Sequence, residues 1–219
     1  MGMKLYTYFR SSAAYRVRIA LNLKKLDCDS AFVNLLHDEQ RSPEYLTTNP
    51  QGLVPALEDE AHVITQSIAI IEYLDERYPE PPLLPRDAAA RAQVRATALA
   101  IACDIHPLNN LRVLRYLENT LGCSKDQRLS WYRYWIAEGF TSLERMLVHN
   151  GSHEFCYGAT PTLADIALVP QVFNAQRYGC DLAPYPHIRR VNEACLRIAA
   201  FRAAEPANQA DAEGVKQAT

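Results

Sequence analysis

Along the first third of the chain, short alternating runs of hydrophobic and polar positions enclose two segments with helical spacing. Lys4–Tyr8 alternates as a half-buried strand does, and from Ser11 to Lys25 the apolar positions recur with helical spacing. Further strands are predicted at Ser30–Leu36, Val54–Leu57 and His62–Thr65, and a second helix over Ser67–Tyr78, which Pro79 ends. The predicted order is therefore β-α-β, an irregular stretch, and β-β-α.

Beyond this region the spacing of hydrophobic positions is helical throughout. A cluster of prolines between Pro79 and Pro85 marks a linker ahead of it. We therefore predict an α/β domain over residues 3–84 and an all-α domain over residues 90–219. The tail after Ala203, rich in small and polar residues, is predicted to be loosely ordered. The predicted helices cover Ala88–Leu121, Gln127–Leu147, Leu163–Asn174 and Pro186–Phe201.

Composition narrows the classes of function. The 219 residues carry a formal net charge of −2, which offers no basic footprint for nucleic acid. Neither a membrane span of ~20 apolar residues nor a secretion signal is recognisable, so we expect a soluble, cytoplasmic protein. The six cysteines form no C-x-x-C pair, which is typical of free thiols in a reducing compartment. We expect no metal site, because the stretch that holds His149, His153 and Cys156 favours a polar loop over a ligand set.

Three junctions in the α/β region carry candidate chemistry. At Tyr8–Ser12, unpaired backbone N–H groups at a helix start favour an anion, and a serine hydroxyl can donate to a thiolate; a simple helix cap is the alternative. The Val54–Pro55 bond, if cis, exposes backbone groups to a ligand. Gln66–Ser67 opens a second helix and suits a carboxylate, again with a cap as the alternative. All three lie at strand ends of one unit, where α/β sheets bind ligands.

Around these junctions the sequence resembles the zeta class of glutathione transferases. The run from Tyr8 to Leu21, YFRSSAAYRVRIAL, is similar to the class signature SSCxWRVRIAL. Other similar segments follow in the order and at the spacing of the class: Asn49–Leu57, Thr65–Leu74, Ile105–Leu111, Thr162–Val172 and Asn174–Tyr178. The resemblance extends from about Met3 to Phe201. The class includes maleylacetoacetate isomerase and maleylpyruvate isomerase.

The resemblance implies a thioredoxin-like first domain, an all-α second domain, a homodimer and glutathione as cofactor. It places Ser11, with Ser12 beside it, at the glutathione sulfur. Val54 would pair its backbone with the cysteinyl part of glutathione through a cis Pro55. The rest of the tripeptide site would be formed by Gln40, Gln66, Ser67, His106 and Asn110.

Two positions depart from the class signature. Ala13 replaces the signature cysteine, and Tyr15 replaces the tryptophan. The implied activity is cis–trans isomerisation of an enone with carboxylates near both ends: the glutathione thiolate adds to the double bond, the bond rotates and the thiolate leaves. Because this chemistry needs no thiol from the protein, we expect the loss of the cysteine to be tolerated.

Arginine suits a substrate that is a dianion, because its fork pairs with carboxylates in a bidentate manner. With the resemblance, Arg10 and Arg177 are expected to bind substrate and assist catalysis, while for Arg112 substrate binding and a surface position are equally balanced. Arg16 and Arg18, inside the first helix, are interpreted as structural. Thr162 and Asp165 have the spacing of a capping box, which favours a structural role for that carboxylate as well.

An additional arginine favours a compact, strongly acidic substrate. The main hypothesis is therefore the conversion of maleylpyruvate to fumarylpyruvate in aromatic catabolism through gentisate. The nearest alternative is maleylacetoacetate isomerisation in tyrosine breakdown. A general conjugating transferase and a non-catalytic glutathione-transferase-like binding protein are the remaining alternatives.

Overall fold

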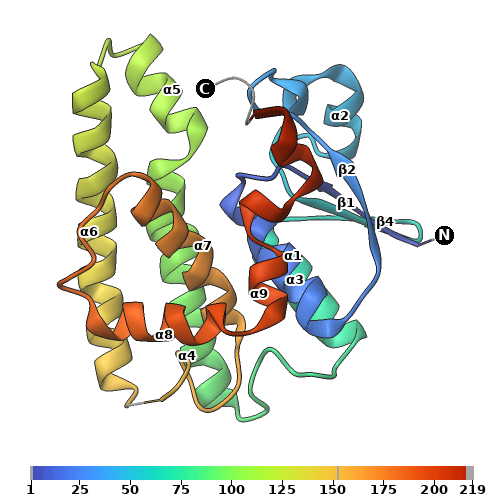
Figure 1. The fold of residues 1–219 in the computed structure, drawn as a ribbon. Coiled ribbons are helices and arrows are strands. Elements are labelled where there is room, and N and C mark those ends of the chain that lie inside the picture. Colours follow the sequence, from blue (N-terminus) through green and yellow to red (C-terminus); the bar gives the residue numbers. More distant parts are fainter. Residues whose placement is uncertain (1, 152, 216–219) are drawn as a thin grey trace. The chain divides into compact units, whose positions relative to one another are not determined.

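The computed structural model describes residues 2–151 and 153–215, and these residues form two compact units (Figure 1). The first unit combines Met1–Pro82 with Leu196–Thr219, and the second comprises Leu83–Cys195. Within the described ranges no helix has both the length and the apolar character needed to cross a membrane.

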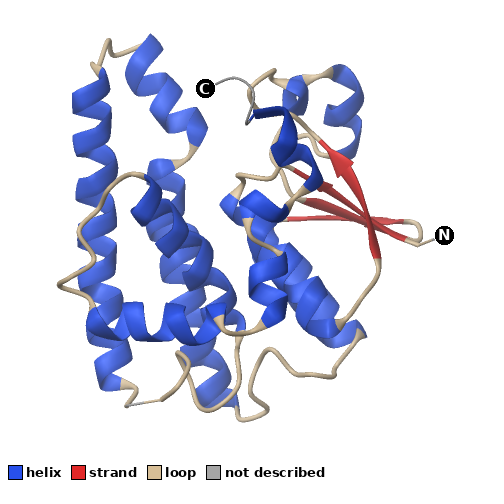
Figure 2. Ribbon diagram, in the orientation of Figure 1, coloured by secondary structure: helices blue, strands red, loops and turns tan. Residues whose placement is uncertain are grey.

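The first unit is built on a four-stranded sheet with the order β2-β1-β3-β4. Its strands are drawn in red in Figure 2. The central strand β1 (Met3–Thr7) pairs in parallel with β2 (Cys28–Phe32) and antiparallel with β3 (Ala56–Asp59). Strand β4 (His62–Thr65) pairs antiparallel with β3 at the other edge. Leu5 and Leu57 face each other in this register, and both are buried in the core.

Two helices pack against each other in this unit, α1 (Ser12–Lys24) and α3 (Ser67–Arg77) (Figure 1). The C-terminal ends of the two helices are tied by Lys24, whose ammonium lies 2.9 Å from the Asp75 carboxylate. The same ammonium donates to the carbonyls of Tyr78 and Pro81 at 2.5 and 2.9 Å. Lys24 therefore does more than complement the helix dipole, because it joins α1, α3 and the turn that follows α3.

Two predictions for the segment between α1 and β3 were wrong. The second strand lies at Cys28–Phe32 instead of Ser30–Leu36, because it pairs with β1 only as far as Thr7. After Phe32 the chain turns, and the Asn34 side chain accepts from the backbone N–H of Leu36 at 2.9 Å. The stretch predicted as irregular contains a 3-10 turn, η1 (Glu39–Arg41), and a short helix, α2 (Pro43–Thr48).

The second unit is helical. Its main helices are α4 (Ala88–Leu99), α5 (Leu111–Asn119), α6 (Lys125–His149), α7 (Leu163–Arg177) and α8 (Pro186–Leu196). The single helix predicted over Ala88–Leu121 is interrupted by a π-helical segment, η2 (Ala100–Ile105), and a 3-10 turn, η3 (His106–Asn109). Pro107 has no N–H to continue the helical ladder, so the chain restarts at Asn110, whose side chain caps α5.

The last part of the chain differs from the predicted boundaries. Residues beyond Leu196 group with the first unit and do not complete an all-α domain of residues 90–219. The tail after Ala203 is also ordered through Val215, in α9 (Ala199–Ala203), η4 (Pro206–Asn208) and η5 (Ala210–Val215). Side chains of α1 hold this segment, since Asn22 donates to the Ala200 carbonyl at 3.0 Å. Residues 216–219 of the predicted domain lie outside the described residues.

Candidate functional site

The junction between β1 and α1 places Ser11 at the N-cap of α1. Its Oγ accepts from the backbone N–H of Ala14 at 3.2 Å, so the capping role proposed from the sequence is present. A serine hydroxyl that accepts one hydrogen bond still carries its own hydrogen to donate. Ser12, the first residue of the helix, is buried. The geometry therefore accommodates both the cap and a donor to an anion at the same oxygen.

Arg10 is held beside Ser11 by two aromatic residues. Its guanidinium donates to the Tyr8 hydroxyl at 3.1 Å and lies 5.0 Å from the centre of the Phe9 ring. Such cation–π contacts restrict the side chain while they leave most of its donors available. The structure thus keeps a positive charge next to the N-terminus of α1.

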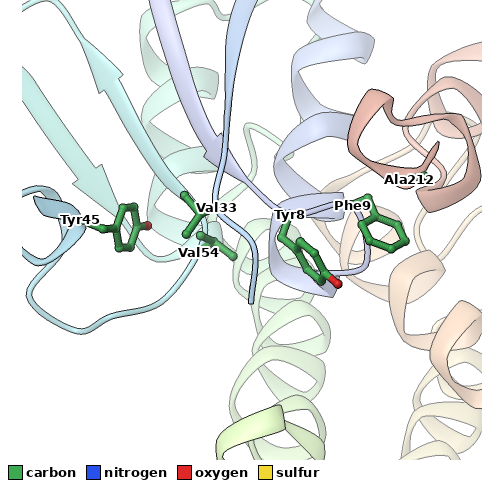
Figure 3. Close-up of a cluster of buried hydrophobic side chains, with 6 residues drawn as sticks. All are labelled: Tyr8, Phe9, Val33, Tyr45, Val54 and Ala212. Atoms are coloured by element: carbon green, nitrogen blue, oxygen red, sulfur yellow. The ribbon is translucent and has the colours of Figure 1, made fainter. Parts of the chain in front are cut away.

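A cluster of buried hydrophobic side chains includes two residues of this junction (Figure 3). Tyr8 and Phe9 come from the junction itself, and their rings meet edge to face at 4.7 Å. Tyr45 donates to the Leu53 carbonyl at 2.7 Å, and burial raises the pKa of Tyr45 to about 12, so the phenol stays a donor. The remaining members are Val33, Val54 and Ala212.

The loop before β3 approaches Gln40. The Val54–Pro55 bond is cis. Gly52 has a φ of +61°, and a Cβ at this position would lie 3.1 Å from the Gln40 carbonyl oxygen, so glycine suits this close approach. The Gln40 side chain is only 6% exposed and donates to Asp38 at 3.0 Å. Its Oε1 atom is buried, and the described part of the chain offers it no donor.

At the start of α3, Gln66 and Ser67 have different surroundings. Gln66 is exposed, has a φ of 70° and makes no capping hydrogen bond with its side chain, which instead donates to Gln51 at 2.9 Å. Ser67 is 5% exposed and accepts from Arg16 at 3.2 Å. Arg16 itself is 1% exposed, so a buried positive charge lies against the N-terminus of α3. Gln51 was not predicted as a site residue, and Arg16 was interpreted as structural only.

In the second unit, Tyr132 of α6 contacts the immediate sequence neighbours of two predicted site residues, Asn110 and Arg177. Asn109, adjacent to Asn110, donates to the Tyr132 carbonyl at 3.4 Å. The Tyr132 ring stacks on Tyr178 at 3.6 Å, and Arg177 lies 5.1 Å from the centre of the Tyr178 ring. The start of α5 and the end of α7 are therefore linked through one aromatic stack.

The remaining residues of this group have different exposures. His106 opens η3 and is half-buried. The side chains of Arg112 and Arg177 are exposed. Tyr132 was missed from the sequence, because an aromatic residue on a long helix has the ordinary spacing of a core position.

Thr162 and Asp165 form the predicted capping box at the start of α7. The Asp165 carboxylate accepts from the Thr162 backbone N–H and hydroxyl, each at 2.8 Å, and from the Cys156 N–H at 2.8 Å. Its structural role is confirmed. Elsewhere among the described residues, no three His, Cys, Asp or Glu side chains are arranged to hold a metal ion. Ser152, in the loop considered for such a site, lies outside the described residues.

This fold and this junction define a class of proteins. Residues 1–76 match the family model described as "Glutathione S-transferase, N-terminal domain". A solved structure described as the holo form of maleylpyruvate isomerase, a zeta-class bacterial glutathione transferase, has a TM-score of 0.93 and 47% identity to the chain, covering 95% of it and 99% of that structure. The chain belongs to the glutathione S-transferase family.

Curated relatives narrow the assignment within the family. Maleylacetoacetate isomerase of Pseudomonas aeruginosa is 49% identical over 95% of the chain and 98% of the relative. Maleylpyruvate isomerase of a Ralstonia species is 48% identical over 95% and 99%. A solved maleylacetoacetate isomerase of Methylobacterium extorquens, described with bound malonate and GSH, has a TM-score of 0.91 and 39% identity, over 94% of the chain and 97% of that structure. Within the family, the chain belongs to the zeta class, which includes the maleylacetoacetate and maleylpyruvate isomerases.

Proposed function

We propose that the chain is a glutathione-dependent cis–trans isomerase that converts maleylpyruvate to fumarylpyruvate. The observation that carries this proposal is the Ser11 hydroxyl at the N-cap of α1, with the Arg10 guanidinium held beside it. The relatives named above act on maleylpyruvate or maleylacetoacetate by their descriptions, at nearly the same identity to this chain. The choice between these two acids therefore depends on the site residues.

Several features of the first unit suit glutathione. The buried Gln40 Oε1 atom calls for a donor, which a peptide ligand can supply. The Gln66 side chain and the buried charge of Arg16 behind Ser67 suit a carboxylate at the start of α3. Val54, beside the cis Pro55, would pair its backbone with the cysteinyl part. In the second unit, His106 and Asn110 would complete the site. Bound glutathione would supply a thiolate that adds reversibly to the cis double bond, which permits rotation.

The residues of the junction would keep that thiol ionised. The Ser11 hydroxyl donates to the sulfur, and the N-terminal end of α1, which begins at Ser12, adds the partial positive charge of the helix dipole. Because this chemistry needs no thiol from the protein, Ala13 at the position of the signature cysteine is compatible with the proposal.

The arginines would bind and orient the acidic substrate. Arg10 is restricted by Tyr8 and Phe9, and Arg177 is propped by the stacked Tyr178 ring. Holding both carboxylates fixes the double bond in position and supplies positive charge where oxygen gains negative charge during the reaction. Arg112, exposed at the start of α5, would be a further carboxylate ligand and favours the shorter and more acidic maleylpyruvate.

The substrate assignment is tested by assaying maleylpyruvate and maleylacetoacetate side by side with glutathione. We expect a higher kcat/KM for maleylpyruvate. A strong preference for maleylacetoacetate would replace the proposed substrate, and turnover of a neutral electrophile with no isomerisation of either acid would support a general conjugating transferase. Absence of glutathione binding in calorimetry would point to a non-catalytic binding protein.

The role of Arg177 is tested by Arg177→Ala, with Arg189→Ala as the control at an exposed arginine of α8 in the same unit. Loss of a charge-assisted pair with a carboxylate should raise KM for the acid about 10- to 100-fold, with glutathione affinity unchanged. The control should leave both unchanged. Weakened glutathione binding in Arg177→Ala would instead move Arg177 to the cofactor site.

The proposal includes a cytoplasmic homodimer that interacts with neither nucleic acid nor membranes. The family resemblance supports the dimer, and the near-neutral net charge of −2 supports the absence of a nucleic-acid partner. Sedimentation equilibrium should give twice the mass of one chain, and the mass of a single chain would contradict the dimer.

A further inference from the structure

The C-terminal segment reaches the β1–α1 junction through Asp211, which lies in η5. The Asp211 Oδ2 atom accepts from the backbone N–H of Phe9 at 2.8 Å, across 202 positions of sequence. The other carboxylate oxygen, Oδ1, is buried and has no hydrogen-bond partner within the described ranges. Burying a carboxylate oxygen without a partner costs free energy, so simple attachment of the tail does not account well for an aspartate here.

Arg18 binds the carbonyl group of Phe9, the residue whose N–H binds Asp211. Arg18 is 6% exposed, and its guanidinium donates to the Phe9 carbonyl at 3.0 Å and to the Ala204 carbonyl at 3.1 Å. Burial lowers the pKa of Arg18 to about 10, and the charge of Asp211 opposes this shift. Phe9 is therefore fixed at its N–H by Asp211 and at its C=O by a guanidinium that also binds the C-terminal segment.

Apolar contacts complete this attachment. Ala212, next to Asp211, belongs to the buried cluster that contains Tyr8 and Phe9 (Figure 3). The Phe9 ring in turn lies 5.0 Å from the Arg10 guanidinium. Phe9 lies two positions before Ser11. A shift of Phe9 would therefore move the ring that supports the Arg10 guanidinium and would disturb the backbone that leads to Ser11.

We propose that Asp211 is a positioning residue of the isomerase: by fixing Phe9, it presents Arg10 to the substrate and Ser11 to the glutathione sulfur. This inference rests on the function proposed above. A positioning residue should influence the ionisation of bound glutathione, whereas a residue that only attaches the tail should influence stability alone.

The test is a pH titration of the thiolate ultraviolet absorbance of bound glutathione in the wild type, Asp211→Ala and Asp211→Asn. Asp181→Ala is the matched control, since the exposed Asp181 also accepts a backbone N–H, from Ala183 at 2.9 Å. We expect Asp211→Ala to raise the thiol pKa, so that the thiolate fraction at neutral pH falls about tenfold. Asp211→Asn, whose amide oxygen can still accept from Phe9, should restore most of it, and the control should match the wild type.

An unchanged thiol pKa in Asp211→Ala, with glutathione bound, would overturn the inference, and so would an Asp211→Asn variant that behaves like Asp211→Ala. If Asp211→Ala does not fold, Asp211→Glu takes its place, because it keeps the charge but displaces the carboxylate by one methylene. A raised thiol pKa in Asp211→Glu would then support the inference, and an unchanged one would overturn it. Failure of the wild type to bind glutathione or to lower its thiol pKa would instead refute the proposed function.

Discussion

At the start of α1, one hydroxyl is assigned two partners. Ser11 Oγ accepts from Ala14 as a helix cap, and its hydrogen is assigned to the glutathione sulfur. The sequence predicted both roles, because a serine at a strand-to-helix junction fits either; the cap is confirmed, and the role as a donor to the sulfur stays a prediction. It did not predict how Tyr8 and Phe9 hold Arg10, since those contacts depend on side-chain packing.

Ser11→Ala should separate the two roles. Loss of the cap should lower the free energy of unfolding by about 1 kcal/mol. Loss of a hydrogen bond to a charged sulfur should lower the thiolate fraction of bound glutathione about 10- to 100-fold, measured by its ultraviolet absorbance. Ser124→Ala, which removes the N-cap of α6, is the control: it should lose similar stability with the thiol pKa unchanged. Equal thiol pKa values in both variants would exclude Ser11 as the donor.

Asp165 gives a prediction for the pH dependence of stability. Burial raises its pKa above 3.8, against the hydrogen bonds that lower it. The folded protein therefore binds the proton of the Asp165 carboxyl group more tightly than the unfolded chain does. The stability that this protonation contributes is fully present below pH 3.8 and is lost as the pH rises through the pKa of Asp165 in the folded protein.

Asp165→Asn should cost about 1–3 kcal/mol at neutral pH, because an amide cannot accept all of the hydrogen bonds made by the carboxylate. It also removes the titration, so the stability advantage of the wild type should grow as the pH falls. Urea unfolding at several pH values measures this advantage, and a constant or shrinking advantage would contradict the raised pKa.

At the scale of elements, the predictions succeeded where local signals were strong. The strands β1 and β4 and the helices α1, α3 and α7 lie close to their predicted positions, because periodicity, caps and Pro79 define them locally. The long helix predicted over Ala88–Leu121 failed, although Pro107 was visible in the sequence. Its neighbours had helical spacing, and the π-helical segment before it depends on packing: a Cβ on Gly139 of α6 would lie 2.3 Å from Ile105.

Lys24 shows how elements of the first unit are joined. Lys24→Met should lower the free energy of unfolding by about 3–5 kcal/mol, because it removes the charge that faces Asp75 in a buried site and the donor to two carbonyls. Lys25→Met, at the exposed neighbouring position, is the matched control and should change stability little. Similar losses in both variants in urea unfolding would contradict this role.

At the scale of the whole molecule, the sequence predicted two parts of different class but not the place of the last residues. The Asp211–Phe9 hydrogen bond spans 202 positions, and no local pattern signals such a contact. The tail looked loosely ordered because its composition is small and polar, whereas three separate anchors, at Asn22, Arg18 and Phe9, order it. The β1–α1 junction and the end of the described chain are thus parts of one folded unit.

The proposed activity is tested at its centre by the fate of glutathione during turnover. Maleylpyruvate is incubated with the protein and a small, sub-stoichiometric amount of glutathione, and both acids and the thiol are followed by NMR. A glutathione-dependent isomerase should convert all of the maleylpyruvate to fumarylpyruvate with the glutathione recovered unchanged, and should give no enzymatic conversion when glutathione is left out. Conversion that stops when the added glutathione is consumed, or that proceeds equally without it, would contradict a glutathione-dependent isomerase.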